Sequence, residues 1–272
     1  MLENTEIHHC FRGSFINQDD AHGIGATHVT VLTIRNCDIH HFSGDCIQVD
    51  PDIRNLAQTK LWDSVVVEVC RLWTAAFTEN CAGFLVGQNP GENGIDTKTF
   101  ENVALPHRPK MSVRNTEVFG WERNTFISNR AVFNVKYSVD WKIDAVRAYN
   151  NQYVFRVRGE WQNTVQGHAT LLLTNSLVYN NVQAFRVERH IPDLRIFNCT
   201  FANNTLVMQH SDSPDQVGYD VASYQMKNSL FLGTKTADAF APSNFSCDST
   251  CFKALSSNDF HLSANAVAID AG

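Results

Sequence analysis

Charged and apolar side chains alternate in the stretch GENGIDTKTF, residues 91–100. In an extended strand, Asp96 and Lys98 point to the same side, because successive side chains point to opposite faces. Glu92 precedes them in a turn-like segment. A carboxylate beside an amine on the outside of a strand can hold a polar ligand, exchange a proton with it, or bind a hard cation. The choice among these depends on what the fold places beside this strand.

A recurring phrase predicts the elements that position these residues. It consists of an apolar residue, a spacer, an asparagine and a second apolar residue, and its asparagines are Asn4, Asn36, Asn115, Asn175, Asn198 and Asn228. Degenerate copies are centred on Val69 and Ala145. Most steps are about 30 residues, the length of one coil of a parallel β-solenoid. Helical periodicity is nearly absent, whereas β-branched residues and turn residues recur.

We therefore predict an all-β fold: one right-handed parallel β-helix domain over residues 1–272, with about eight coils and room for a further segment before Met1. The asparagines of the phrase are expected to lie on one line. We also expect them to point inward, where their amides would bond along the stack and satisfy the turn backbone.

Two stretches carry a resemblance to a known family. The coil LTIRNCDIHHFSGDCIQVDP and the closing segment FHLSANAVAIDAG resemble right-handed parallel β-helix proteins of the pectin-lyase-like superfamily. The resemblance covers nearly the whole chain and implies the architecture. It implies an activity less specifically, because the superfamily contains lyases, hydrolases, epimerases and non-catalytic spike proteins.

A second strand follows each phrase, and its apolar pairs align these strands with one another. Residues between the apolar pairs must face outward. One outward column reads Gln48, Asp96, Asn134, Arg156, Arg186 and Met208, and its neighbour reads Asp50, Lys98, Lys136, Arg158, Glu188 and His210. Cations on rungs about 4.8 Å apart repel each other. The stripe therefore favours a binding groove, with insertions after Trp73 and after Phe100 as its walls.

The resemblance implies that this stripe binds an anionic, uronic-acid-containing polysaccharide and cleaves it by β-elimination. Such lyases neutralise the carboxylate with calcium or basic side chains and remove the adjacent proton with a lysine or arginine. The predicted catalytic residues are Lys98, Lys136, Arg156 and Arg158. Neighbouring cations favour a neutral lysine that can act as a base, and arginines hold carboxylates with two hydrogen bonds.

Further side chains are predicted to complete the site. The predicted substrate-binding residues are Asn134, Arg186, Glu188, His210, Trp161 and Tyr137; Trp73 also lies at a strand end and is expected near the stripe. Calcium is the one cofactor expected, and its predicted oxygen ligands are Asp50, Glu92 and Asp96.

Two other functions fit the same stripe. A non-catalytic glycan-binding or surface module would use the same arginines without turnover, since a mixed-charge ladder also stabilises an exposed sheet. A glycoside hydrolase of polygalacturonase type is the second alternative. GDCIQV and AHGIG partly resemble the Asp-Asp-Cys and Gly-His-Gly segments of those enzymes, but a glycine replaces one aspartate and the two segments occur in reverse order. That mismatch removes one of the two carboxylates that hydrolysis needs.

Composition excludes some partners and suggests a location. The net charge is −6, and there is neither a basic run nor an aromatic RNA-binding motif, so we expect no nucleic-acid partner. No apolar run is long enough to cross a membrane. Three glycosylation sequons, at Asn198, Asn203 and Asn244, suggest a protein that is secreted or at the cell surface. We also expect a monomer. Candidate disulfides are Cys247–Cys251 and Cys70–Cys81, with buried free thiols equally expected for the other cysteines.

Overall fold

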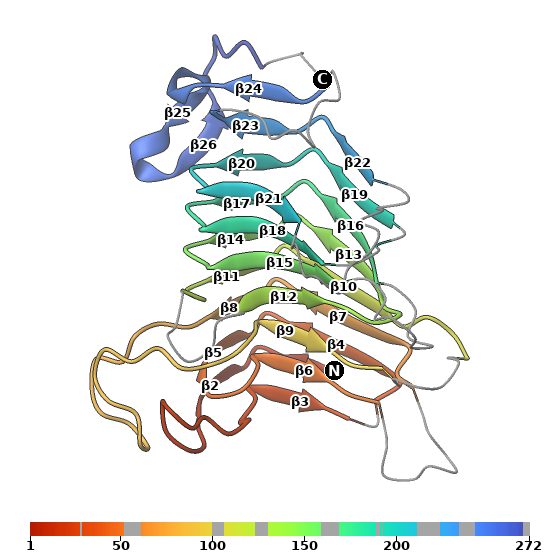
Figure 1. Ribbon diagram of the computed structural model, residues 1–272, viewed down its shortest axis with the longest axis vertical. Coiled ribbons are helices and arrows are strands. Elements are labelled where there is room, and N and C mark those ends of the chain that lie inside the picture. Colours follow the sequence, from red (N-terminus) through yellow and green to blue (C-terminus); the bar gives the residue numbers. More distant parts are fainter. Residues whose placement is uncertain are drawn as a thin grey trace.

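The strands of the computed structural model form three parallel sheets that stack coil upon coil (Figure 1). The structure describes residues 1–27, 29–51, 61–99, 106–122, 130–158, 169–188, 191, 193–210, 224–233 and 243–268. The first sheet has eight strands, which agrees with the predicted number of coils. In order they are β1 (Leu2–Glu3), β4 (Val31–Arg35), β7 (Ser64–Glu68), β10 (Lys110–Arg114), β13 (Asp140–Asp144), β16 (Thr170–Thr174), β19 (Asp193–Phe197) and β22 (Tyr224–Lys227).

A strand of the second sheet and then a strand of the third follow each of the first seven strands of the first sheet, whereas β22 is followed by two strands of the second sheet. The second contains β2 (Glu6–Cys10), β5 (Asp38–Phe42), β8 (Arg71–Trp73), β11 (Glu117–Phe119), β14 (Arg147–Tyr149), β17 (Leu177–Tyr179), β20 (Thr200–Ala202), β23 (Leu230–Leu232) and β24 (Phe245–Cys247). The third contains β3 (Ile24–Ala26), β6 (Ile47–Val49), β9 (Ile95–Thr97), β12 (Ala131–Val135), β15 (Tyr153–Arg158), β18 (Gln183–Glu188) and β21 (Leu206–His210). The predicted parallel β-helix is confirmed.

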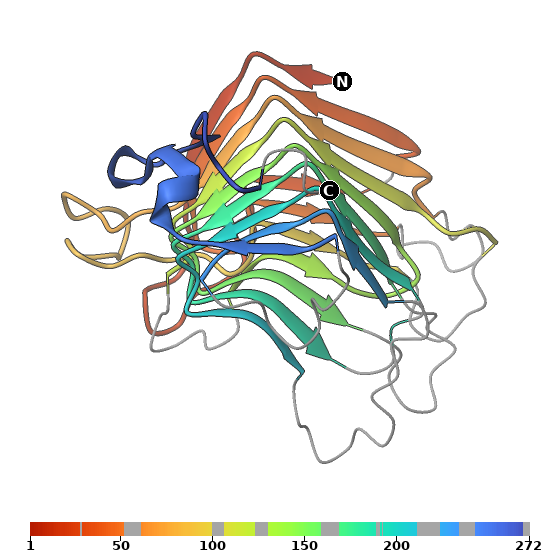
Figure 2. The same cartoon turned by 90° about the horizontal axis from the view of Figure 1, so that it is seen from above.

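Viewed from above, the first and second sheets meet at a corner, and the third sheet lies opposite that corner (Figure 2). A small antiparallel hairpin of β25 (Phe252–Ala254) and β26 (Asp259–Leu262) lies on the side of the second sheet. Two short 3-10 turns flank β25, at Ser249–Cys251 and Leu255–Ser257. No helix in the described ranges has the length and apolarity needed to cross a membrane.

Inward side chains of the third sheet form a continuous column in the core. Phe133, Phe155 and Phe185 stack on one another with ring centroids 5.3 Å and 4.8 Å apart. Ile95 and Ile47 continue the column toward the N-terminus, and all five side chains are fully buried. Each such side chain stabilises the fold by about 1.5–3 kcal/mol, so the column fixes the register of the outward residues between its members.

The asparagines of the recurring phrase lie on one line, as predicted. They occupy the turn between the first and second sheets, with φ from 49° to 56°, and Val69 and Ala145 take the same left-handed conformation. Their side chains, however, are exposed, so the predicted inward orientation is wrong. Asparagine is favoured here because it tolerates the left-handed region better than most residues.

The residue after each turn asparagine is the one that faces inward. Its hydroxyl accepts a hydrogen bond from the backbone of the preceding coil: Cys70 N donates to Thr116 Oγ1 at 3.4 Å, and Cys199 N donates to Ser229 Oγ at 3.3 Å. Thiols occupy the same position in other coils. Cys70 Sγ, for example, lies 3.2 Å from the Glu68 carbonyl oxygen.

A second turn, just before the third sheet, carries the inward asparagine ladder. The Asn151 Nδ2 group donates to Asn181 Oδ1, and Asn181 Nδ2 donates to Asn204 Oδ1, both at 2.9 Å. The same oxygens accept the backbone N–H groups of Asn151 and Asn181 at 3.0 Å and 3.1 Å. Asn151 and Asn181 are 2% exposed. The ladder thus satisfies polar groups that a dry interior would leave unpaired.

Two expectations about covalent modification are corrected. All eight cysteines lie in the described ranges and all are free thiols, so neither candidate disulfide is formed. Asn244 is buried, donating to the Met226 carbonyl at 2.7 Å and accepting from Ser229 N at 3.0 Å, so it is not accessible for glycosylation. Asn198 and Asn203 are exposed.

Candidate functional site

The register of the third sheet brings most of the predicted outward column together. Gln48 pairs with Asp96, Asp96 with Asn134, Asn134 with Arg156, and Arg156 with Arg186. The prediction is wrong at the next coil, where Gln209 pairs with Arg186. Met208 faces the core beside Phe185 and is 6% exposed. His210 pairs with Val187, so it does not lie beside Glu188 as predicted.

A hollow of about 260 Å³ opens on the outer face of the third sheet. It is lined by Asp20, Asp45, Gln48, Glu92, Asn93, Asp96, Lys98, Asn134, Lys136 and Arg156. Six of these are predicted site residues, and the structure gathers them from three strands and one loop. Asp50 is not among the lining residues but accepts a hydrogen bond from Gln48 Nε2 at 2.7 Å. Asp20 was not predicted, because it comes from an irregular loop before β3 that no periodicity places.

Asp96 lines the hollow and is almost fully buried. Lys136 Nζ lies 2.8 Å and 3.0 Å from its two carboxylate oxygens, and Asn134 Nδ2 donates to its Oδ1 at 2.9 Å. Lys98 Nζ is farther away, at 3.9 Å, and donates to Gln48 Oε1 at 3.0 Å. The Lys136 side chain is 10% exposed and that of Lys98 39%. Of the two predicted base residues, Lys98 is therefore the accessible one.

Three arginines converge on Glu188 next to the hollow. Arg156 donates to both carboxylate oxygens at 2.9 Å and 3.2 Å, while Arg186 Nε lies 2.7 Å and Arg158 Nε 3.3 Å from an oxygen. Burial would raise the pKa of Glu188, but the hydrogen bonds from Arg156 and the charges of all three arginines hold it below its usual range. Burial, followed by the charge of Arg156, lowers the pKa of Arg158. Within the described ranges, three guanidinium groups thus share the single carboxylate of Glu188.

These pairings correct the prediction of an uncompensated run of cations. Asp96 separates Lys98 from Lys136, and Glu188 neutralises one charge of the arginine group. The repulsion inferred from the column is relieved within the stripe itself. What remains is a polarised surface, with most carboxylates in the hollow and the arginine group at its edge, where Arg156 is a lining residue.

A pH titration is expected to separate the contribution of Glu188 to stability. Because the folded state lowers its pKa from 4.5, its ionised form stabilises the fold above that pH, and the contribution is lost as the pH falls through the lower folded value. Replacing Glu188 by glutamine should therefore lower the melting temperature at neutral pH, with a difference from wild type that shrinks below pH 4.5. A difference that stays constant across the titration would contradict this.

Glu92 and Asp45 have the opposite electrostatic environment. Burial and the charges of Asp20 and Asp96 raise the pKa of Glu92. Asp45 is 2% exposed and accepts from Asn93 N and Nδ2 at 3.0 Å and 2.8 Å, and burial followed by the charge of Asp96 raises its pKa. The pKa values of these two carboxyl groups in the hollow are thus raised, whereas that of Glu188 beside it is lowered.

The segment that carries Glu92 is fastened to coils on both sides. The buried Arg130 donates through Nη2 to the Pro90 carbonyl at 2.8 Å and through Nη1 to the Asn89 carbonyl at 3.2 Å. Burial lowers the pKa of Arg130 to about 9. On the other side, Gly91 N donates to Gln18 Oε1 at 3.0 Å and Glu92 N to the Gly44 carbonyl at 2.7 Å. The predicted wall after Trp73 thus ends in the hollow, while residues 100–105 after it lie outside the described part.

The predicted aromatic residues have different outcomes. Tyr137 lies next to the stripe, with Lys136 Nζ 5.2 Å from its ring centroid. Trp161 lies outside the described residues. Trp73 belongs to the second sheet, where it stacks on Phe119 at 5.6 Å, so its expected place near the stripe is wrong.

The predicted calcium ligands do not form a cation site as they are arranged. Within the described ranges, no group of three or more His, Cys, Asp or Glu side chains could hold a metal ion. The carboxylate oxygens of Asp96 accept hydrogen bonds from Lys136 and Asn134, and Asp50 accepts one from Gln48. As arranged here, Asp50, Glu92 and Asp96 are therefore not a preformed calcium site.

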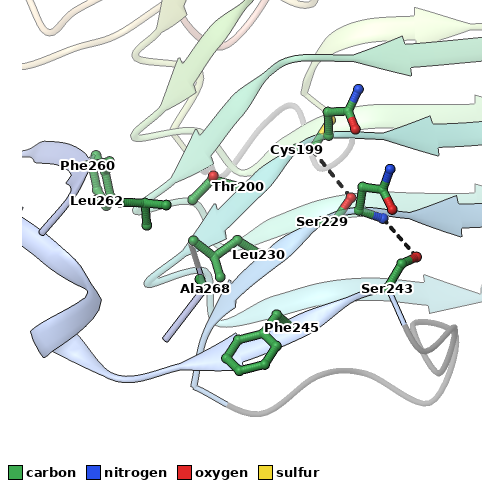
Figure 3. A pocket seen from close by; sticks show the side chains of 11 residues that line it. Cys199, Thr200, Ser229, Leu230, Ser243, Phe245, Phe260, Leu262 and Ala268 are labelled. Atoms are coloured by element: carbon green, nitrogen blue, oxygen red, sulfur yellow. Dashed lines mark hydrogen bonds between the residues drawn. The ribbon is translucent and has the colours of Figure 1, made fainter. Parts of the chain in front are cut away.

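A second hollow of about 230 Å³ lies near the C-terminus, between the outer face of β23 and β24 and the strand β26 (Figure 3). Its lining carries no charged side chain and includes Leu230, Phe245 and Phe260. None of the predicted site residues is among its lining residues.

Fold and site together define a parallel β-helix protein with a polarised, mixed-charge face on its third sheet. Comparison of the chain with protein-family models, with curated proteins and with solved structures yields no match. The geometry of this face is therefore the feature that points to a function.

Proposed function

We propose that the protein is a secreted polysaccharide lyase related to the pectin-lyase-like superfamily. It binds a uronic-acid-containing polymer along the third sheet and cleaves it by β-elimination. The observation that carries the proposal is the convergence of Arg156, Arg158 and Arg186 beside a hollow that has one accessible lysine among its described lining residues. Guanidinium groups bind carboxylates in a planar, bidentate manner, and a carboxylate so neutralised makes the adjacent C–H bond more acidic.

Lys98 is the base in this proposal. In its neutral form Nζ takes the proton from the carbon next to the carboxylate, and the C–H electron pair becomes a carbon–carbon double bond. The glycosidic C–O bond breaks, and the leaving oxygen keeps its electron pair and takes up a proton. Lys136 and Asn134 hold Asp96 in place beside Lys98.

Hydrolysis is the second candidate, and two observations favour it. Glu92 and Asp96 line the same hollow, with a raised pKa at Glu92 and an ion pair to Lys136 at Asp96. The segments AHGIG and GDCIQV also meet, since Asp45 N donates to His22 Nδ1 at 2.9 Å. A carboxyl group with a raised pKa and an ion-paired carboxylate in one hollow resemble the acid and base pair that glycoside hydrolysis requires.

One screen distinguishes the candidates. The protein is incubated with pectate, alginate and glycosaminoglycans, with and without calcium, and both ultraviolet absorbance and reducing ends are followed. A lyase raises both signals, a hydrolase raises only reducing ends, and a non-catalytic module binds without either. Absence of binding to every acidic polymer would overturn the proposal.

Replacing Arg158 by alanine is expected to weaken binding of the acidic polymer about tenfold, because a charge-assisted contact is lost. Titration calorimetry measures the change. Arg71, an arginine on the outer face of the second sheet, provides the matched control, and its replacement by alanine should leave affinity unchanged. Equal losses in both variants would indicate non-specific attraction to a basic surface.

A further inference from the structure

Four histidines lie together on β2 and β5 of the second sheet. They form two adjacent pairs at the same register of successive coils: His8 with His9, and His40 with His41. The rings of His8 and His40 stack with centroids 5.1 Å apart, and those of His9 and His41 with centroids 5.6 Å apart. Among the described residues, these rings belong to no group of three or more ligands that could hold a metal ion. Their chemistry is therefore that of protons.

Two of the four histidines occupy a turn position that asparagine fills in later coils. His9 and His41 have φ of 58° and 54°, and the corresponding residues of three later coils have φ from 53° to 55°. Those residues are Asn150, Asn180 and Asn203. The turn itself therefore does not require a histidine, and asparagine is a replacement that this position accepts.

A hydrogen bond joins the two rings of each pair through their Nδ1 atoms. Such a bond needs one N–H donor and one unprotonated acceptor, whereas a protonated imidazole has two donors and no acceptor. Glu6 Oε1 lies 3.2 Å from His40 Nε2 and favours a proton on that ring. When His40 is protonated, Nδ1 of His41 must stay unprotonated for the bond to persist. Protonation of both rings therefore breaks the bond.

Burial resists that second proton. Burial, followed by the charges of His40 and His9, lowers the pKa of His41 to about 4. Burial, followed by the charges of His8 and His40, also lowers the pKa of His9, while Glu79 opposes that shift. Because both folded values lie below the ordinary 6.5, the neutral rings stabilise the cluster above that pH. The contribution is lost as the pH falls through the lower folded values.

The surroundings of the cluster offset little of the charge that acid adds. Trp73 stacks on His40 with centroids 4.3 Å apart, and the guanidinium group of Arg71 lies 5.3 Å from the Trp73 ring centroid. Within the described ranges, Glu6 is the one carboxylate in contact with a ring nitrogen of the four. The titratable and charged groups that face the rings are Glu6 and Cys10 on β2, Asp38 on β5, Arg71 on β8, and Glu79 in the loop after β8.

Loop 77–88 is attached to the sheet by aromatic contacts that end on this cluster. His41 stacks on Phe77 at 5.5 Å, and His9 meets the edge of Phe11 at 5.7 Å. Phe11 in turn lies 5.0 Å from Phe77 and 5.2 Å from Phe84. Among the described residues, the hydrogen bonds of this loop join its own members, such as Phe77 N to the Gln88 carbonyl at 2.9 Å. The rings therefore hold the loop in place.

We propose that the four histidines form an acid-sensitive latch, which holds loop 77–88 on the second sheet at neutral pH and releases it on acidification. Protonation breaks the bonds within the pairs and makes the stacked rings repel one another, so the contacts of His41 with Phe77 and of His9 with Phe11 are lost. The loop belongs to the wall after Trp73, and its release opens that wall. This inference goes beyond the proposed function and does not depend on it.

Hydrogen exchange followed by mass spectrometry tests the latch, with labelling times scaled to the intrinsic exchange rate at each pH. Between about pH 7 and about pH 4.5, peptides from residues 77–88 are expected to lose protection about tenfold, whereas peptides from β10 keep theirs. Equal protection of the loop at the two pH values overturns the proposal. Equal losses in the loop and in β10 also overturn it, because they indicate acid unfolding of the whole domain.

A double variant assigns the response to the histidines. His9→Asn with His41→Asn keeps the left-handed turns and removes two titrating rings, so the loss of protection in loop 77–88 should shrink to about twofold or less. His261→Asn, at an exposed histidine on the C-terminal hairpin, is the matched control and should keep the tenfold loss. A tenfold loss in the double variant would assign the response to carboxyl groups such as Glu79 and would overturn the proposal.

Discussion

Replacing Asn181 by leucine is expected to lower the free energy of unfolding by about 3–5 kcal/mol. Its Nδ2 group donates to the Ala148 and Tyr179 carbonyls and to Asn204 Oδ1, and its Oδ1 accepts two hydrogen bonds from Asn151. Leucine leaves these buried partners unpaired, and each such group costs about 1–3 kcal/mol. Urea denaturation followed by circular dichroism measures the change.

Asn175 is the matched control for that prediction. It belongs to the exposed line of turn asparagines, with φ of 51°. Leucine there loses the left-handed preference of asparagine but leaves no buried group unpaired, so the loss should be about 1 kcal/mol. If the two leucine variants were equally unstable, the assignment of inward and outward ladders would be wrong.

Replacing Lys98 by alanine is expected to reduce lyase turnover at least about 100-fold, because a general base contributes about that much. Binding of the polymer should change about twofold or less, since the interaction is made in the transition state. Turnover is followed by ultraviolet absorbance and binding by calorimetry. Lys142, an exposed lysine on β13 of the first sheet, is the control.

Two results would contradict the assignment of Lys98 as the base. Full activity in the Lys98 variant would exclude it as the group that removes the proton. A large loss in the Lys142 variant would show that the assay responds to general charge. Lys136 is a poorer test of the base. Its replacement removes the close ion-pair partner of the buried Asp96, so we expect it to lower stability as well.

The sequence predicted the fold and the outward column because both follow from alternation. Ile95, Phe133 and Phe155 occupy the same position of successive coils. Because their side chains are buried on the inner face, the residues between them must face outward. The error at β21 arose because Leu206, Val207 and Met208 are all apolar, so apolarity alone does not fix the register. The inward asparagine does fix the register, because Asn204 lies the same number of residues before Met208 as Asn181 lies before Phe185.

The orientation of the asparagines could also have been read from the sequence. Three coils carry adjacent pairs, Asn150–Asn151, Asn180–Asn181 and Asn203–Asn204. In each pair the first residue is exposed with φ from 53° to 55°, and the second joins the ladder. A doublet therefore marks a turn whose second residue faces inward. A single asparagine followed by a small residue marks the exposed line.

The hollow could be predicted only in part. Asp96, Lys98 and Asn134 follow from strand register, but Asp20 and Glu92 come from loops before β3 and β9. Loop residues have no period, so their side chains cannot be placed by alignment. The column predicts a mixed-charge ladder in which Arg158 lies beside Glu188, but it does not show that this one carboxylate reaches three arginines at once.

The anchoring of residues 89–92 bears on the entropy of binding. Arg130 on one side, and Gln18 and Gly44 on the other, hold this segment in place before any ligand arrives. A wall already fixed in this way has little conformational freedom left to lose when a ligand binds. Most of the interaction free energy of the hollow is then available as affinity, and little is spent on ordering the protein.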